Sequence, residues 1–127
     1  MTASKLALRA APLILMVGMG FGIFMAARQD HTLMPAHAHL NLLGFVGTLL
    51  MGLVYRLDPA TDASRLARAQ IIVWLAAVAV LFVSLAFLLY GYEGAEIGTS
   101  IASIVAFLMV GVFAAMVFRI TGRERSA

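Results

Sequence analysis

The chain has 127 residues, of which 63% are hydrophobic and 12% are charged, and its mean hydropathy of +1.00 excludes a water-soluble fold with a polar surface. Its net charge of +3 comes from basic residues scattered over the ends of apolar segments, which excludes the basic stripe of a nucleic-acid-binding protein. It has no cysteine, which excludes disulfides, thiolate metal sites, iron-sulfur clusters and covalently attached c-type haem.

Four apolar runs are separated by polar residues, and they predict an all-α fold. They comprise residues 10–27, 36–55, 69–90 and 97–118. Each has roughly 18 to 22 residues, which at a rise of about 1.5 Å per residue matches a hydrocarbon core of about 30 Å. We therefore expect four transmembrane helices in contact with the lipid bilayer. The links between them are short, which favours a single domain, residues 1–127, folded as an up-down antiparallel bundle.

The first run follows two basic residues, Lys5 and Arg9, as the apolar part of a secretory signal does. It is long enough to span a membrane and no small-residue cleavage site follows it, so we expect a retained helix. Gly18 and Gly22 lie four positions apart on this helix and form a small-residue surface. Such a surface allows close helix approach, either within the chain or between subunits.

The basic residues indicate how the helices are oriented. Arg28 lies at one end of the apolar runs, and the other end carries Lys5, Arg9, Arg56, Arg65, Arg68, Arg119, Arg123 and Arg125. Lys and Arg near helix ends favour the cytoplasmic side, so both termini are expected in the cytoplasm. The chain would then be a multi-pass protein of a bacterial-type inner membrane, with the link after the first run on the periplasmic side. Tyr90 and Tyr92 would mark the outer interface, and Tyr55 and Trp74 the inner one.

All three histidines lie near the start of the second run, in the stretch DHTLMPAHAHLN (residues 30–41). Pro35 suits the first turn of a helix, so the second helix is expected to begin near it. Successive helical residues turn by about 100°, so His37 and His39 face nearly opposite ways. His39 shares its side with apolar residues and needs a hydrogen-bond partner or the membrane interface. His37 heads a stripe of small and polar side chains: Asn41, Gly44, Thr48, Met51 and Tyr55.

An imidazole near the hydrocarbon edge is costly unless its nitrogens are satisfied, and ionisable residues there usually have a function. A flat cofactor would fit the stripe headed by His37, because Gly44 leaves room for a macrocycle and Asn41 or Thr48 can orient the imidazole. Neutral imidazole ligates the iron of b-type haem and also suits copper. The alternative for each histidine is a solvated position at the interface, without a ligand.

Residues 35–44, PAHAHLNLLG, continuing to Tyr55 and Arg56, resemble part of subunit I of the haem-copper oxidase superfamily, which includes nitric oxide reductases. The likeness covers little more than the second run. In that family the second helix enters from the outer side with a histidine ligand to a low-spin haem. The resemblance implies this role for His37 or His39, and the polar face favours His37. The family has more helices and further histidines, whereas this chain has none after His39 and so cannot build an oxygen-reducing centre alone.

The leading expectation is a haem b-binding membrane protein that acts in electron transfer, with a redox partner, or binds a diatomic gas. It is not expected to be an enzyme on its own; an enzymatic role would be that of an oxidoreductase. Because His37 and His39 diverge, the second axial ligand must be His31, Met34, a histidine of a neighbouring subunit or a gas. The family's subunit is similar to three arcs of four helices, which implies a homo-oligomer here, a trimer or a dimer. Arg28 lies on the side of the histidines and is expected to pair with haem propionates.

Two other interpretations remain open. In the first, His31, Met34, His37 and His39 supply nitrogen and thioether ligands to a copper-binding or copper-handling protein. In the second, the chain is a structural accessory subunit without a cofactor, and its histidines only lie at the interface.

Overall fold

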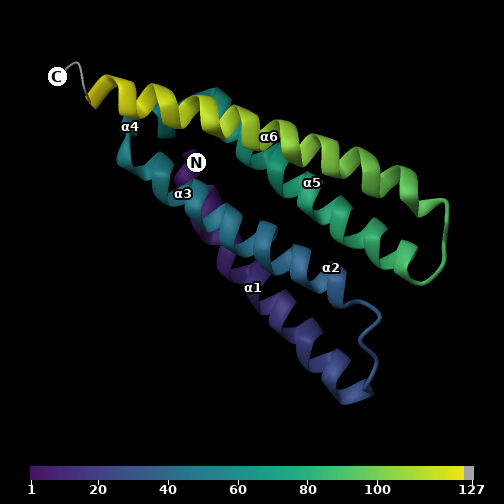
Figure 1. The fold of residues 1–127 in the computed structure, drawn as a ribbon. Coiled ribbons are helices and arrows are strands. Elements are labelled where there is room, and N and C mark those ends of the chain that lie inside the picture. Colours follow the sequence, from purple (N-terminus) through teal and green to yellow (C-terminus); the bar gives the residue numbers. More distant parts are fainter. Residues whose placement is uncertain (125–127) are drawn as a thin grey trace.

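The structure is a computed structural model that describes residues 1–124; Arg125, one of the basic residues counted above, lies outside the described residues. Within the described range the chain forms helices joined by short links (Figure 1). One segment, η1, is π-helical. The elements are α1 (Ala3–Arg28), α2 (Met34–His39), η1 (Leu40–Gly47), α3 (Thr48–Leu57), α4 (Pro59–Asp62), α5 (Arg65–Leu89) and α6 (Ala95–Glu124).

Four helical spans have the length and composition to cross a membrane: Ala3–Arg28, Met34–Leu57, Arg65–Leu89 and Ala95–Arg123. The prediction of an all-helical fold with four such helices is confirmed. Two of the spans, α1 and α5, begin before their apolar runs, and a side chain caps the first turn of each. Thr2 Oγ1 accepts a hydrogen bond from the Lys5 N–H (3.4 Å), and Ser64 Oγ accepts one from the Ala67 N–H (3.1 Å).

The links between the spans are short and locally stabilised. α1 ends at Arg28, and Gln29 follows in the left-handed conformation (φ 51°). The carboxylate of Asp58 accepts a hydrogen bond from the Thr61 N–H (3.1 Å) and so caps α4, a short helix that the apolar pattern does not predict. Gly91 (φ 92°) makes the turn from α5 to α6, in a conformation that glycine adopts without steric cost.

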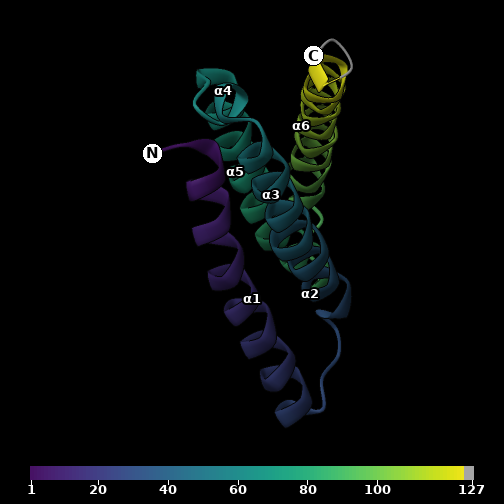
Figure 2. The same cartoon turned by 90° about the vertical axis from the view of Figure 1, so that its left-hand side faces the viewer.

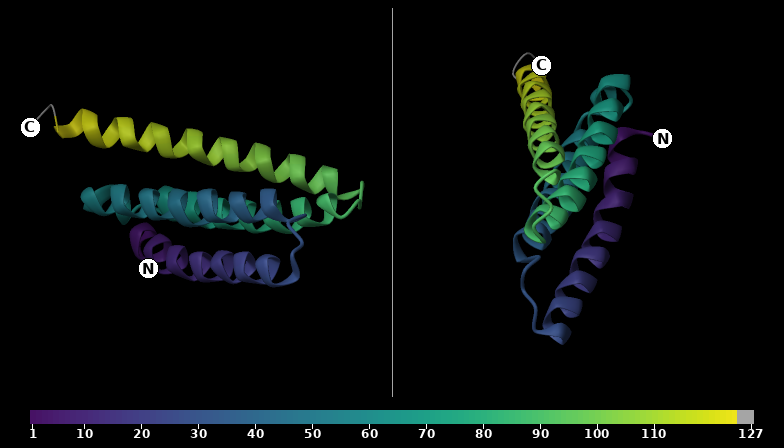
Figure 3. Two further views of the ribbon diagram at one scale, coloured as in Figure 1. Left: turned by 60° about the horizontal axis from the view of Figure 1, so that its bottom comes forward. Right: turned by 90° about the vertical axis from the view of Figure 1, so that its right-hand side faces the viewer.

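The second span, made of α2, η1 and α3, forms the middle of the structure together with α5. α1 packs along the second span, and α6 packs along α5. Figure 3 (left) shows α6 on one side of this middle layer and α1 on the other, and Figure 2 shows the same order from another direction. Consecutive spans run in alternating directions (Figure 1).

Polar contacts join both α1 and α6 to the region of α4. The backbone N–H and the hydroxyl of Ser4 donate to the two carboxylate oxygens of Asp62 (2.6 and 2.8 Å). The guanidinium of Arg123 pairs with Asp58 (3.2 Å). The first turn of α1 and the last turns of α6 therefore lie at the same end of the structure, the α4 end.

Buried polar side chains connect α3, α5 and α6. Tyr55 and Trp74 are 0% and 1% exposed, so the prediction that they mark the membrane interface was wrong. The Tyr55 hydroxyl donates to Gln70 Oε1 (3.0 Å), the Trp74 indole N–H donates to Thr48 Oγ1 (2.9 Å), and the Gln70 amide donates to the Met109 carbonyl (3.1 Å). An aromatic ring with a polar group can be buried when that group finds a partner, and here each one does.

Candidate functional site at the histidines

The link between α1 and α2 is held by its own side chains. The Asp30 carboxylate accepts hydrogen bonds from the hydroxyl (2.6 Å) and the backbone N–H (3.0 Å) of Thr32. The hydroxyl, followed by the N–H, keeps the pKa of Asp30 below its ordinary value. Pro35 then occupies the first turn of α2, as predicted. This link places His37 and His39 in the first turns of the second span.

His37 lies against α1. A Cβ on Gly22 would approach His37 Cε1 to 3.2 Å, and a Cβ on Gly18 would overlap the side-chain amide of Asn41. The small-residue surface of α1 therefore serves packing within the chain. Asn41 Nδ2 lies 3.2 Å from His37 Nε2, and since an amide nitrogen can only donate, His37 Nε2 accepts this hydrogen bond.

The remaining polar atoms of this pair, His37 Nδ1 and Asn41 Oδ1, are buried and have no hydrogen-bond partner. With Nε2 accepting from the amide, the imidazole proton is on Nδ1. The Nε2 lone pair of His37 is thus occupied, and its other nitrogen is enclosed by protein. In this structure His37 offers no free nitrogen to a ligand.

The room that was expected for a macrocycle beside Gly44 is filled. A Cβ on Gly44 would lie 2.7 Å from Ile14 Cγ2 of α1 and 3.2 Å from Val78 Cγ1 of α5. Gly44 thus allows three helices to approach closely. Its place in a cofactor site is not supported, because the neighbouring helices occupy the space that the sequence of the second span alone leaves open.

His39 lies on the other side of the second span, and its two ring nitrogens differ. Its Nδ1 is 2.7 Å from the carbonyl oxygen of Pro35. A carbonyl can only accept, so the proton is on Nδ1 and the Nε2 lone pair is free. The side chain is exposed. The divergence of His37 and His39 agrees with the turn expected of a helix.

A groove of about 270 Å³, the His39 groove, opens where the second span, α5 and α6 meet. Besides His39, it is lined by Leu43, Trp74, Leu81, Ser103, Ala106, Phe107 and Val110. These walls are mostly apolar, and the Trp74 ring is held by its bond to Thr48. The sequence gives no signal that pairs His39 with residues of two later helices, so this groove was not predicted.

The other predicted site residues are spread apart. His31, Met34 and Arg28 are exposed, and the Arg28 guanidinium stacks on the Phe24 ring at 5.3 Å. Among the described side chains, those of residues 1–123, no group of three or more from His, Asp and Glu is close enough to hold a metal ion. The structure therefore does not gather the three histidines into one copper site.

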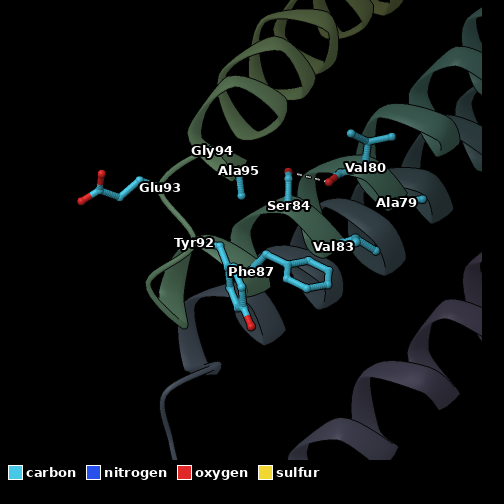
Figure 4. Close-up of a pocket in the computed structure, with 9 residues that line it drawn as sticks. All are labelled: Ala79, Val80, Val83, Ser84, Phe87, Tyr92, Glu93, Gly94 and Ala95. Atoms are coloured by element: carbon cyan, nitrogen blue, oxygen red, sulfur yellow. Dashed lines mark hydrogen bonds between the residues drawn. The ribbon is translucent and has the colours of Figure 1, made fainter.

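A larger cavity of about 810 Å³ lies between the second half of α5 and the start of α6 (Figure 4). Val83 and Phe87 contribute apolar surface to its walls. The Ser84 hydroxyl donates to the carbonyl of Val80 (2.6 Å), and Glu93 points away from the cavity in Figure 4. This cavity therefore offers apolar surface, as suits a lipid chain, and no convergent groups for chemistry.

Comparison with known proteins places the chain in no family: no protein-family model, no curated protein and no solved structure matches it. The fold therefore assigns the chain to a broad structural class, that of helical proteins with four candidate membrane spans. Two diverging histidines, one bound to a side-chain amide and one with a free nitrogen, distinguish one end of its second span.

Proposed function

We propose that this chain is a b-type haem-binding membrane protein with His39 as axial ligand through Nε2, acting in electron transfer or in binding a diatomic gas. The observation that supports it is the 2.7 Å hydrogen bond from His39 Nδ1 to the Pro35 carbonyl. Histidine ligands usually donate their second N–H to a carbonyl or carboxylate, which orients the ring and makes the ligating nitrogen more basic. His37 lacks this arrangement, so His39 replaces it as the preferred ligand. The resemblance of residues 35–44 to haem-copper oxidase subunit I favours haem as the cofactor.

The residues around His39 fit part of a porphyrin. Leu43, Trp74 and Phe107 provide apolar and aromatic surface of the kind that a macrocycle face contacts. The groove, at about 270 Å³, is smaller than the roughly 300–1,000 Å³ of an enclosing ligand site. It would hold one part of the ring, with the rest on its open side. Haem bound there would supply a one-electron redox centre or an iron that binds a gas.

A second copy of the chain is the proposed cover for that open side. Leu42 and Leu53 of the second span are 64% and 47% exposed, and Phe107 beside the groove is 77% exposed. A dimer or trimer that meets here would shield the ring and bring a neighbour's histidine toward it. His37 cannot complete the ligation within one chain, because it faces α1. Where no neighbour's side chain binds, the iron of bound haem would be able to take up oxygen or nitric oxide.

Arg28 has no role in this proposal. It belongs to α1, which packs against His37 and Asn41 of the second span. A group bound to His39 would lie on the side of α5 and α6 instead. Propionates would have to reach the aqueous edge of that side, because the Ser103 hydroxyl in the groove wall already donates to the Thr99 carbonyl (2.7 Å).

The proposed orientation puts both termini in the cytoplasm and His39 on the periplasmic side of a bacterial-type inner membrane. It is supported by the basic residues of the described part of the chain, which apart from Arg28 belong to the α4 end. Contacts of Ser4 and Arg123 with the α4 region place the first turn of α1 and the last turns of α6 at that same end. A fluorescent protein fused to the C-terminus should therefore fluoresce, and an alkaline phosphatase fusion should be inactive. The opposite pair of results would reverse the orientation.

The haem proposal is tested with His39→Ala and its matched control His37→Ala. Each variant and the wild type are expressed with iron and porphyrin in excess, purified in mild detergent, and scanned before and after reduction. Wild type and His37→Ala should show a Soret band and b-type reduced-minus-oxidised peaks, and His39→Ala should lose most of its haem. A colourless, folded wild type would overturn the proposal, as would full haem content in His39→Ala. Copper found by elemental analysis without a Soret band would establish the copper interpretation instead.

A further inference from the structure

A third hollow, the α4-end cavity, differs in chemical character from the His39 groove and from the larger cavity between α5 and α6. It measures about 200 Å³ and lies between α4, the start of α5 and the last turns of α6. Its walls combine two guanidinium groups and two hydroxyls with apolar side chains: Thr61, Ser64, Leu66, Met116, Arg119 and Arg123. The proposed haem site at the opposite end of the helices makes no use of it.

The charges around the α4-end cavity leave it positive. Arg123 pairs with Asp58 (3.2 Å) through one nitrogen, and a guanidinium offers five N–H donors in all. Asp58, which also accepts from the hydroxyl and N–H of Thr61, lies outside the wall and offsets only one of the two guanidinium charges. Among residues 1–123, Arg119 forms no ion pair. Its charge therefore adds to that of a cavity which already contains the guanidinium of Arg123.

The start of α5 adds to this positive potential. Ser64 caps this 25-residue helix by accepting from the Ala67 N–H (3.1 Å), and its own hydroxyl hydrogen remains able to donate. The first N–H groups of a helix have no partner within it and carry the positive end of its dipole. The guanidinium groups, the Ser64 hydroxyl and the first backbone N–H groups of α5 are all hydrogen-bond donors, and together they can bind the oxygens of a phosphate group.

We propose that the α4-end cavity binds a phosphate group, and that the phosphate is the headgroup of an anionic phospholipid. The cavity lies at the ends of membrane-spanning helices, where headgroups are found. Leu66 and Met116 give it an apolar wall that suits the glycerol and upper chain carbons of a lipid. Basic pockets between helices at a cytoplasmic surface are suited to anionic lipids, and the other arginines of this end would raise their local concentration.

The test is a titration of phosphatidylglycerol into protein in neutral detergent, followed by native mass spectrometry. Arg119→Gln should weaken binding and raise the apparent Kd by about tenfold or more, because the charge-assisted hydrogen bonds of the guanidinium are lost. Arg56→Gln is the matched control, because Arg56 is exposed at the same end but does not line the cavity. It should weaken binding far less than Arg119→Gln does. Arg119→Lys, which keeps the charge without the planar fork, should fall between the two.

Two results would overturn the proposal. Equal weakening by Arg119→Gln and Arg56→Gln would show attraction to surface charge in general, without a defined cavity. Binding of inorganic phosphate as tight as that of phosphatidylglycerol would assign the cavity to the free anion and not to a lipid. Circular dichroism of each variant checks that the fold is retained, which is expected because the Arg119 side chain is exposed and forms no ion pair with residues 1–123.

Discussion

Replacing Gly18 with alanine should weaken the contact between α1 and the second span. Gly18 is buried, and a Cβ there would overlap the amide of Asn41 and lie 2.8 Å from its Cγ. The amide must shift to make room, and the shift strains or breaks its 3.2 Å hydrogen bond to His37 Nε2. Gly20 is the matched control, because it lies on the same helix and a Cβ on it would meet nothing within 4 Å.

Two costs add up at Gly18, and one gain opposes them. Overpacking a close contact costs about 1–3 kcal/mol, and losing the bond between Asn41 and His37 costs about 1 kcal/mol. Replacing a glycine inside a helix returns about 0.5–1 kcal/mol. Gly18→Ala should therefore lower the free energy of unfolding by about 1–3 kcal/mol. Gly20→Ala should leave it unchanged or raise it by up to about 1 kcal/mol.

Equilibrium unfolding in mixed micelles of a mild detergent and dodecyl sulfate, followed by circular dichroism, measures both variants. Equal stabilities would refute the packing of α1 against Asn41. The same proteins also bear on the choice of haem ligand. With His39 as ligand, Gly18→Ala should keep the haem content and spectrum of the wild type. A Soret band that shifts or disappears in Gly18→Ala but not in Gly20→Ala would point to His37.

Two further predictions concern the buried polar contacts and the α4 end. Gln70→Leu should lower the free energy of unfolding by about 1–3 kcal/mol in the same assay, because the Tyr55 hydroxyl and the Met109 carbonyl lose a partner inside the protein; an unchanged stability would contradict this role. Hydrogen bonds from Thr61 hold the pKa of Asp58 below its ordinary value of 3.8. The ionised carboxylate therefore stabilises the fold above pH 3.8, and this contribution is lost as the pH falls through the pKa of the folded state. Between about pH 5 and about pH 3, wild type should lose more stability than Asp58→Asn, and equal losses would rule the effect out.

The four spans could be predicted because a bilayer permits few solutions. Without water, backbone groups must bond within their own segment, so long apolar runs form helices. The helix ends could not be predicted as closely, since capping and polar flanks decide them. α1 begins at Ala3, well before its apolar run at residue 10, because Thr2 caps it. The existence of α4 depends in the same way on the side chain of Asp58.

The divergence of His37 and His39 was also predictable, but the nitrogen that is free for a ligand was not. That depends on which helix packs on each side of the second span, and contacts between helices leave no periodic signal in one sequence. The pairing of Gly18 with Asn41 is a contact of this kind. The bond from His39 to Pro35 is different: it joins residues four apart on one helix, a spacing that the sequence does display.

The predicted stripe from His37 to Tyr55 assumed a constant turn of about 100° per residue. The structure contains the π-helical segment η1, whose turns hold more residues than those of an α-helix. The face therefore changes partner along its length. Its first part, at His37 and Asn41, packs against α1, whereas Thr48, beyond η1, bonds Trp74 of α5. Nothing in the apolar pattern distinguishes these wider turns from ordinary ones.

Segment η1 makes the effect of a deletion in the second span depend on where it falls. A π-helical turn holds about one residue more than an α-helical turn, so deleting one residue between Leu40 and Gly47 would let ordinary α-helical turns form and would leave the two halves of the span close to their present faces. The same deletion within α3, which has no wider turn to absorb it, would rotate the residues after it by about 100° against His39. The aim of the His39 imidazole relative to the rest of the groove therefore tolerates a lost residue in one part of the span and not in the next.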